Sequence, residues 1–348
     1  MTFSPDFWTT HVGSVPYRED AALCERLARM LDVPAWPQMP RRSFRESMYV
    51  QYSAALPAVV VDETGEKITF NTEGDLTPAL EAFYERYLAD DVESFGLSPE
   101  YAAGFYAMLE ALQAVPGDWA KGQVTGPISF GLTVTDQNLR ASLYNDMLAD
   151  AIVKNAAMNA RWQVRQLKAT RPNAIIFVDE PYMASFGSAY ISLSREQVIA
   201  MLDEVFDAIH QEGALAGVHC CANTDWSVLL ATTVDILNLD AYGYLENLAL
   251  YPAELRAFLD RGGVVAWGIV PNNEAIEGLT PEAVAQKLRE GFALISSKAE
   301  ARGVAIAPEE LAARSLITPS CGLGSASEAI AGQVFDVLAH VGETLRRG

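Results

Sequence analysis

The sequence predicts an α/β fold, and within that class a single (β/α)₈ TIM barrel domain spanning residues 1–348. Short apolar runs alternate with segments of helical periodicity, and the alternation occurs eight times along the chain. Most of the apolar runs are continuous rather than alternating, which is typical of strands covered on both faces. Eight such units in 348 residues match the size of a barrel, and the 50% of residues that are hydrophobic are enough for a large core.

The predicted strands are bounded by Gly, Pro, Asp or Asn, as strands usually are. In chain order they lie within residues 7–16, 55–70, 122–130, 174–181, 215–220, 234–242, 264–271 and 315–322. The second of these runs also contains a hairpin-like turn. A doubly wound open sheet is the alternative fold, but no predicted strand is followed by the glycine-rich phosphate-binding motifs common in that class.

The helical segments between these runs begin and end at recognisable residues. The clearest lie within residues 78–95, 194–213 and 281–303. Ser194 and the pair Thr280–Pro281 are helix-start signals, whereas Gly213 and Gly303 are helix-stop signals.

The charge balance and the cysteine count narrow the class of protein. The chain has 45 acidic and 25 Lys or Arg residues, for a net charge of −20. Nucleic acids and anionic membranes bind to surfaces rich in Lys and Arg, so we expect neither as a partner. Four cysteines in so long a chain form no disulfide framework, and the N-terminal residues do not resemble a signal peptide. These features predict a cytoplasmic protein.

Polar side chains gather where the predicted strands end. Barrel enzymes build their sites at the carboxyl ends of the strands, so these residues are candidates for a functional site. The candidates are Ser14, Asp179, Glu180, His219, Cys221, Asp240, Asn272, Asn273 and Cys321.

Three of these candidates predict a zinc site. His219 and Cys221 are two residues apart, so on a strand they point to the same side, while Cys220 points away. Zinc binds His nitrogen and Cys sulfur, and a catalytic zinc site has three protein ligands and one open position. Cys321, at the end of another strand, could supply the third ligand. Alternatively, the cysteines are small buried apolar residues and His219 is an ordinary core residue. Asp240 could be a fourth ligand or could orient another ligand.

Six short motifs, in this order along the chain, match a known family. They are VGSVP (12–16), TGP (125–127), VDEP (178–181), HCC (219–221), LNLD (237–240) and PSCGLGS (319–325). With them the chain resembles the catalytic, C-terminal barrel of cobalamin-independent methionine synthase. That barrel belongs to the UROD/MetE-like superfamily, which includes uroporphyrinogen decarboxylase and zinc methyltransferases that serve corrinoid proteins.

The resemblance implies a zinc-dependent methyltransferase of methionine biosynthesis that methylates a thiol, most simply homocysteine. His219, Cys221 and Cys321 match the zinc ligands of the family, and Asp240 falls where the family has a Glu ligand. Asp179 matches the carboxylate that binds the amino group of homocysteine. Ser14 matches a residue that contacts the amino acid end of that substrate. No catalytic residue is assigned beyond the zinc centre.

One departure from the family bears on the methyl donor. Family members that use folate carry a histidine in a D-x-H-S motif after the seventh barrel strand, whereas this chain has GIVPNNEAIEG and no histidine from 220 to 339. Methyl-tetrahydrofolate has an amine leaving group that must be protonated, but a methyl-corrinoid leaves without a proton. We therefore expect a corrinoid or corrinoid protein as donor, with methyl-tetrahydrofolate as the rival. Glu274, Tyr242 or a water molecule could replace the missing acid.

Two other functions fit the same fold. A decarboxylase of the uroporphyrinogen type would work without a metal, but it needs basic side chains for several substrate carboxylates, and this chain is acidic. A barrel that only binds a ligand, with a closed structural zinc site or none, is the alternative that is not an enzyme.

Overall fold

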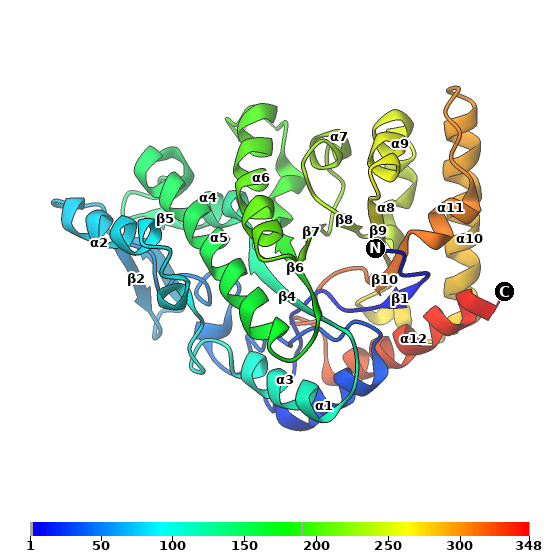
Figure 1. Ribbon diagram of the computed structural model, residues 1–348, viewed down its shortest axis with the longest axis horizontal. Coiled ribbons are helices and arrows are strands. Elements are labelled where there is room, and N and C mark those ends of the chain that lie inside the picture. Colours follow the sequence, from blue (N-terminus) through cyan, green and yellow to red (C-terminus); the bar gives the residue numbers. More distant parts are fainter. Residues whose placement is uncertain (1–2, 189–190, 348) are drawn as a thin grey trace.

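A parallel sheet of seven strands forms the centre of the computed structural model, which describes residues 3–188 and 191–347. In spatial order the strands are β1 (Trp8–Thr9), β10 (Ser315–Pro319), β9 (Val264–Val270), β8 (Ile236–Leu239), β7 (Leu215–Cys220), β6 (Asn173–Asp179) and β4 (Trp119–Thr125). The sheet curls, and helices surround it (Figure 1). The α/β prediction is confirmed, and the sheet has the curvature of a TIM-like barrel, but its seven strands form an open sheet and not eight closed ones.

A segment with no assigned strand lies between the two edges of this sheet. Val33 donates its backbone N–H to Thr9 O at 3.0 Å on one edge, and Lys121 donates to Pro34 O at 2.8 Å on the other. Trp36 returns a bond to Lys121 O at 3.3 Å. Residues 33–38 therefore link β1 to β4, in the place that the second strand of a barrel would take.

The second predicted strand, residues 55–70, is wrong as a barrel strand. It forms a hairpin of β2 (Val59–Asp62) and β3 (Lys67–Phe70), which pairs with β5 (Thr135–Asp136) in a separate sheet of three strands. The linking segment escaped prediction because its sequence, VPAWPQ, holds two prolines in six residues. Proline has no N–H for a strand ladder, so such a sequence does not indicate a central strand.

The other predicted runs all contain a strand of the main sheet, and their apolar composition reflects how deeply these strands are buried. β9 is buried along its whole length, and β4, β6 and β7 are buried at every residue but the first. A small apolar cluster that includes Ile175, Phe177 and Ile236 is separate from the larger core under the helices. Both faces of the strands are thus covered, which explains the continuous apolar runs.

The helices run in chain order between and beyond the strands. The α-helices are α1 (Ala21–Met30), α2 (Thr77–Leu88), α3 (Ala103–Ala114), α4 (Pro127–Thr133), α5 (Asp146–Lys168), α6 (Arg195–Gln211), α7 (Trp226–Leu230), α8 (Ala241–Leu248), α9 (Pro252–Asp260), α10 (Pro281–Glu300), α11 (Pro308–Ala313) and α12 (Glu328–Arg347). The 3₁₀ turns are η1 (Phe44–Glu46), η2 (Val92–Phe95), η3 (Ser142–Tyr144), η4 (Pro181–Ser185) and η5 (Glu274–Ile276). None of the helices within residues 3–188 and 191–347 is both long and apolar enough to cross a membrane.

The predicted helix ends agree with the structure where a cap was identified. Ser194 forms a capping box at the start of α6, and Thr280 caps α10. Gly213 and Gly303 follow these helices with φ of 68° and 75°, a conformation that glycine adopts without strain. The predicted helix 78–95 is interrupted, because α2 ends at Leu88 and a separate 3₁₀ turn begins at Val92.

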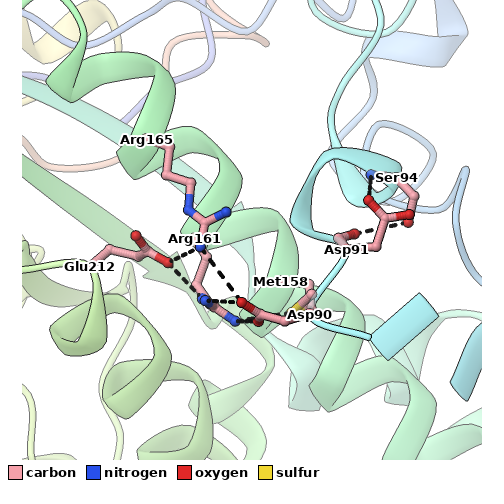
Figure 2. A network of polar contacts seen from close by, with 7 residues as sticks. All are labelled: Asp90, Asp91, Ser94, Met158, Arg161, Arg165 and Glu212. Atoms are coloured by element: carbon pink, nitrogen blue, oxygen red, sulfur yellow. Dashed lines mark hydrogen bonds and ion pairs between the residues drawn. The ribbon is translucent and has the colours of Figure 1, made fainter. Parts of the chain in front are cut away.

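An ion-pair network fixes the connection after α2 against α5 and the end of α6 (Figure 2). Arg161 of α5 pairs with Asp90 and, at 2.8 Å, with Glu212. Arg165, one turn later, also contacts Glu212 at 2.8 Å. The network lies on the helices outside the sheet, so its role is to hold these elements together.

Candidate metal centre

Three side chains from the ends of β7 and β10 converge at the carboxyl edge of the sheet. His219 lies in β7, Cys221 follows it, and Cys321 follows β10. One ligand atom from each of the three lies within 4.8 Å of the others, and Cys321 Sγ is 3.7 Å from His219 Nε2. Zn–N and Zn–S bonds of about 2.1 and 2.3 Å at a tetrahedral angle place the two atoms about 3.6 Å apart. The donors and their spacing therefore fit a zinc ion.

Cys220 takes no part in this cluster. Its side chain is fully buried in the core and its Sγ lies 3.5 Å from Ala222 O. Burial raises the pKa of the Cys220 thiol to about 12, as expected for a cysteine that serves as a small apolar residue.

The ring of His219 is held in one orientation by Asn238 of β8. His219 Nδ1 lies 2.6 Å from Asn238 Oδ1. The amide nitrogen of Asn238 donates to Ala266 O at 2.7 Å and to Thr318 Oγ1 at 2.9 Å, so its oxygen must face the ring. Nδ1 then carries the proton, and the lone pair of Nε2 points at the two sulfurs. Such a partner on the far nitrogen is characteristic of histidines that bind metals.

The two cluster thiols shift each other's pKa in opposite directions. The contact with Cys321, and then that with His219, lowers the pKa of Cys221, whereas the contact with Cys221 and burial raise the pKa of Cys321. Cys221 is therefore the more acidic thiol of the pair. Both thiols would lose their protons to a bound metal ion.

A cavity of about 460 Å³ opens directly onto the cluster. Ser14 and Asp179, the two residues predicted to bind substrate, line it together with His219, Cys221 and Cys321. Ser14 Oγ accepts a hydrogen bond from Gly324 N at 3.3 Å, which ties the end of the first predicted strand to the loop after β10. The structure therefore brings five of the six predicted site residues to one cavity.

Asp179 lines this cavity and has a buried carboxylate oxygen without a hydrogen-bond partner among the described residues. It ends β6 and is 7% exposed, and the oxygen without a partner is Oδ1. Burial raises the pKa of Asp179 to about 6, while His219 and Lys121 act to lower it. A buried acceptor without a partner is costly, so a ligand with an N–H donor would be bound favourably here.

Asp240 stands apart from the cluster. It is the N-cap of α8, and its Oδ1 accepts a hydrogen bond from Gly243 N at 2.8 Å. The carboxylate is not among the ligand atoms that lie within 4.8 Å of one another. In this geometry Asp240 caps a helix, and its role as a zinc ligand stays a prediction.

The VDEP and TGP motifs contact each other at the start of α4. Glu180, fully buried, accepts hydrogen bonds from Ile128 N at 2.9 Å and from Ser129 N at 2.7 Å. A Cβ on Gly126 would lie 2.1 Å from Glu180 Oε1. Gly126 is therefore required for the close approach of this carboxylate, and Glu180 is a helix cap, although it neighbours Asp179.

Glu46 is a cavity residue that the sequence did not reveal. It is fully buried, and one carboxylate oxygen pairs with Arg42 at 2.6 Å. The other oxygen, Oε2, has no partner among the described residues, and the side chain lines the cavity. Glu46 lies in a 3₁₀ turn in a segment without helical or strand periodicity, so no pattern marked it.

The predicted substitutes for the missing histidine do not line the cavity. Glu274 begins η5 and is exposed. The ring of Tyr242 lies under Lys287, whose Nζ is 4.0 Å from its centroid, in a separate pocket beside α8 and α10. Apart from the three cluster residues, the titratable groups among the described residues that line the main cavity are Glu46, Tyr49 and Asp179, and burial raises the pKa of each.

The chain is similar in fold to a known thiol-methylating enzyme. Comparison with protein-family models gives no match, and neither does comparison with curated protein sequences. A B12-independent methionine synthase from Shewanella sp., solved in complex with selenomethionine, matches 97% of this chain and 97% of its own, at a TM-score of 0.57 and 16% identity. A β-glycosidase from Thermosphaera aggregans matches 99% of this chain and 97% of its own, at a TM-score of 0.49 and 11% identity. The first likeness shows a shared fold, and it supports the resemblance drawn from the motifs at that level alone.

Proposed function

We propose that this protein is a zinc-dependent methyltransferase that transfers a methyl group to the thiol of homocysteine or a similar amino thiol. One observation carries the proposal: three nitrogen and sulfur donors with the spacing of a zinc site face a cavity of about 460 Å³. Three protein ligands leave a fourth position for a substrate thiol. We place the protein in the cytoplasm, without a nucleic acid or membrane partner, on the strength of its net charge of −20 and its cysteine usage.

His219, Cys221 and Cys321 would hold the zinc ion. When bound there, zinc would supply an ionised acceptor thiol at neutral pH, which a free thiol with a pKa of about 8.5 does not provide. Asn238 accepts the Nδ1 proton of His219, which leaves Nε2 as the ring nitrogen that would bind the ion. Binding of the ion would release the thiol protons of Cys221 and Cys321.

The substrate would be oriented by the residues around the cluster. Asp179 would accept N–H bonds from the substrate ammonium group through the oxygen that has no partner. Ser14 also lines the cavity and would contact the amino acid end. The acceptor sulfur forms a bond to the methyl carbon, and the bond from that carbon to the donor breaks with its electron pair remaining on the donor.

The donor in this proposal is a methyl-corrinoid, with methyl-tetrahydrofolate as the alternative. A corrinoid leaves without a proton, which agrees with a cavity whose one described histidine is His219. Methyl-tetrahydrofolate stays an alternative because of Glu46, a buried carboxyl with a raised pKa that could protonate the amine leaving group.

Uroporphyrinogen-type decarboxylation fits the cavity less well. The described residues that line it include two carboxylates and no Lys or Arg, so a substrate with several carboxylates would meet like charges. A ligand-binding barrel without activity remains the other alternative, and its zinc site would not react to thiols.

The proposal is tested by zinc content and by methyl transfer. Elemental analysis should find one zinc per wild-type chain and much less in Cys321→Ser. Homocysteine given with methylcobalamin, or separately with methyl-tetrahydrofolate, should yield methionine with the wild type. Equal zinc in both proteins, or no product with either donor, would overturn the assignment. Product from folate alone would reverse the order of donors.

A further inference from the structure

Cys321 is the ligand whose position depends most on its loop. It comes from β10, which β8 and β9 separate from the strand that carries the other two ligands. The register of β10 against β9 shifts between Thr318 and Pro319, and Cys321 lies beyond the last paired residue. The strand ladder alone therefore does not fix the direction of the Cys321 side chain.

Asn272, two residues after β9, bonds to both neighbours of Cys321. Its Oδ1 lies 3.1 Å from Ser320 Oγ, which donates to it, and its backbone N–H donates to Ser320 Oγ at 3.2 Å. Its amide nitrogen donates to Gly322 O at 3.0 Å. The amide can have only one orientation, because the carbonyl of Gly322 accepts and cannot donate.

The loop is also packed closely from its other side. A Cβ on Gly322 would lie 2.2 Å from Ser14 Oγ, and Leu323 donates its N–H to Ser14 O at 2.8 Å. Residues 320–323 are thus confined between Ser14 and Asn272. The neighbouring Asn273 has a different role, because its side chain accepts a bond from Ala275 N at the start of η5.

We infer that Asn272 is a positioning residue for the metal centre, which holds Cys321 within reach of His219 and Cys221. The effect of Asn272 on metal binding rests on the proposed function, whereas its effect on the position of the Cys321 loop does not.

Metal affinity tests this role directly. Wild type, Asn272→Ala and Asn273→Ala are titrated with zinc against a chromophoric chelator, and with cobalt(II) alone to record the sulfur-to-cobalt charge-transfer band. Loss of an outer-shell partner weakens metal binding by about 10- to 100-fold. We expect that loss, with a weaker band, in Asn272→Ala, and zinc affinity within about twofold of wild type in Asn273→Ala. Equal affinities in the two variants would overturn the inference.

A second variant and a metal-free readout separate this inference from the proposed function. Ser320→Ala should give part of the same loss, and the double variant should show less than the sum, because the two residues share one network. Alkylation of Cys321 by iodoacetamide in metal-free protein, followed by peptide mass spectrometry, should be faster in Asn272→Ala at an unchanged melting temperature. Faster alkylation with no zinc in the wild type would sink the proposed function and leave this inference standing. An unchanged rate would sink the inference.

Discussion

Replacing Asn238 by alanine should weaken zinc binding as well as the fold. Asn238 is fully buried, and His219 is 3% exposed. The substitution removes the acceptor for His219 Nδ1 at 2.6 Å and the donors to Ala266 O and Thr318 Oγ1. Nothing then favours the tautomer of the imidazole with its proton on Nδ1, and a proton on Nε2 would compete with a metal ion.

The magnitude follows from these contacts. Each buried polar group left without a partner costs about 1–3 kcal/mol. The hydroxyl of Thr318 can rotate to another partner, so the ring and one carbonyl dominate, and the free energy of unfolding should fall by about 2–4 kcal/mol. Zinc affinity should fall by about 10- to 100-fold, which corresponds to about 1.4–2.7 kcal/mol.

Asn159→Ala is the matched control. Asn159 is also buried, and it donates to Phe95 O at 2.9 Å and accepts from Gln163 Nε2 at 2.9 Å, on α5 away from the cluster. Urea unfolding of the metal-free proteins should show a loss of stability in both variants. Zinc competition should show a loss of affinity in Asn238→Ala alone. If both variants bind zinc as the wild type does, the argument about the His219 tautomer is refuted.

Three further predictions concern Asp179, Gly126 and His210. Asp179→Asn should raise KM for homocysteine by about 10- to 100-fold, since a charged hydrogen bond is lost, and should leave KM for 3-mercaptopropionate nearly unchanged; equal effects on both thiols would contradict an ammonium site. Gly126→Ala should lower the free energy of unfolding by about 2 kcal/mol or more, because its Cβ would lie 2.1 Å from a buried carboxylate oxygen, whereas Gly332→Ala, whose Cβ would make only an ordinary contact at 3.9 Å with the Tyr17 hydroxyl, should be neutral or stabilising. The hydrogen bond to Asp235 raises the pKa of His210. The stability that this ion pair contributes is therefore present below a pH of about 6.5 and is lost as pH rises through the folded-state pKa. In urea unfolding, His210→Gln should therefore be less stable than wild type at acidic pH, and the two free energies of unfolding should converge at alkaline pH. A difference that grows with pH would contradict the ion pair.

The sequence predicted those parts of the fold that depend on burial. Continuous apolar runs became strands because both faces are covered, and the caps at Ser194 and Thr280 mark helix starts in the structure. The segment 33–38 was missed, since backbone bonds to two sheet edges leave no periodic signal in a proline-rich sequence. The hairpin at 55–70 was misplaced because a strand pattern does not specify the sheet that it joins.

The candidate site was predicted to the extent that its chemistry is carried by unusual residue types. His219, Cys221 and Cys321 are rare residues at strand ends, and strand periodicity separated Cys221 from Cys220. Glu46 could not be found in this way, because a glutamate in a connecting segment is common. Asn272 was a candidate by its place at a strand end, but its role was not predicted. The partners of Asn272 lie about 50 residues further along the chain, and only the folded structure brings them to it. Glu46 comes to the cavity from a segment whose pattern does not mark it.

The two asparagines explain how ligands from separated strands can form one centre. β8 and β9 lie between β7 and β10, and each contributes one of them: Asn238 from β8 supports His219, and Asn272 after β9 supports the loop of Cys321. Asn238 also bonds to Ala266 of β9 and to Thr318 of β10, so a single amide connects all four strands. A change in the curvature of the sheet would strain these bonds before it separated the ligands. The spacing of the cluster is therefore set by the intervening strands, and substitutions on β8 and β9 should alter metal affinity although neither strand supplies a ligand to the cluster.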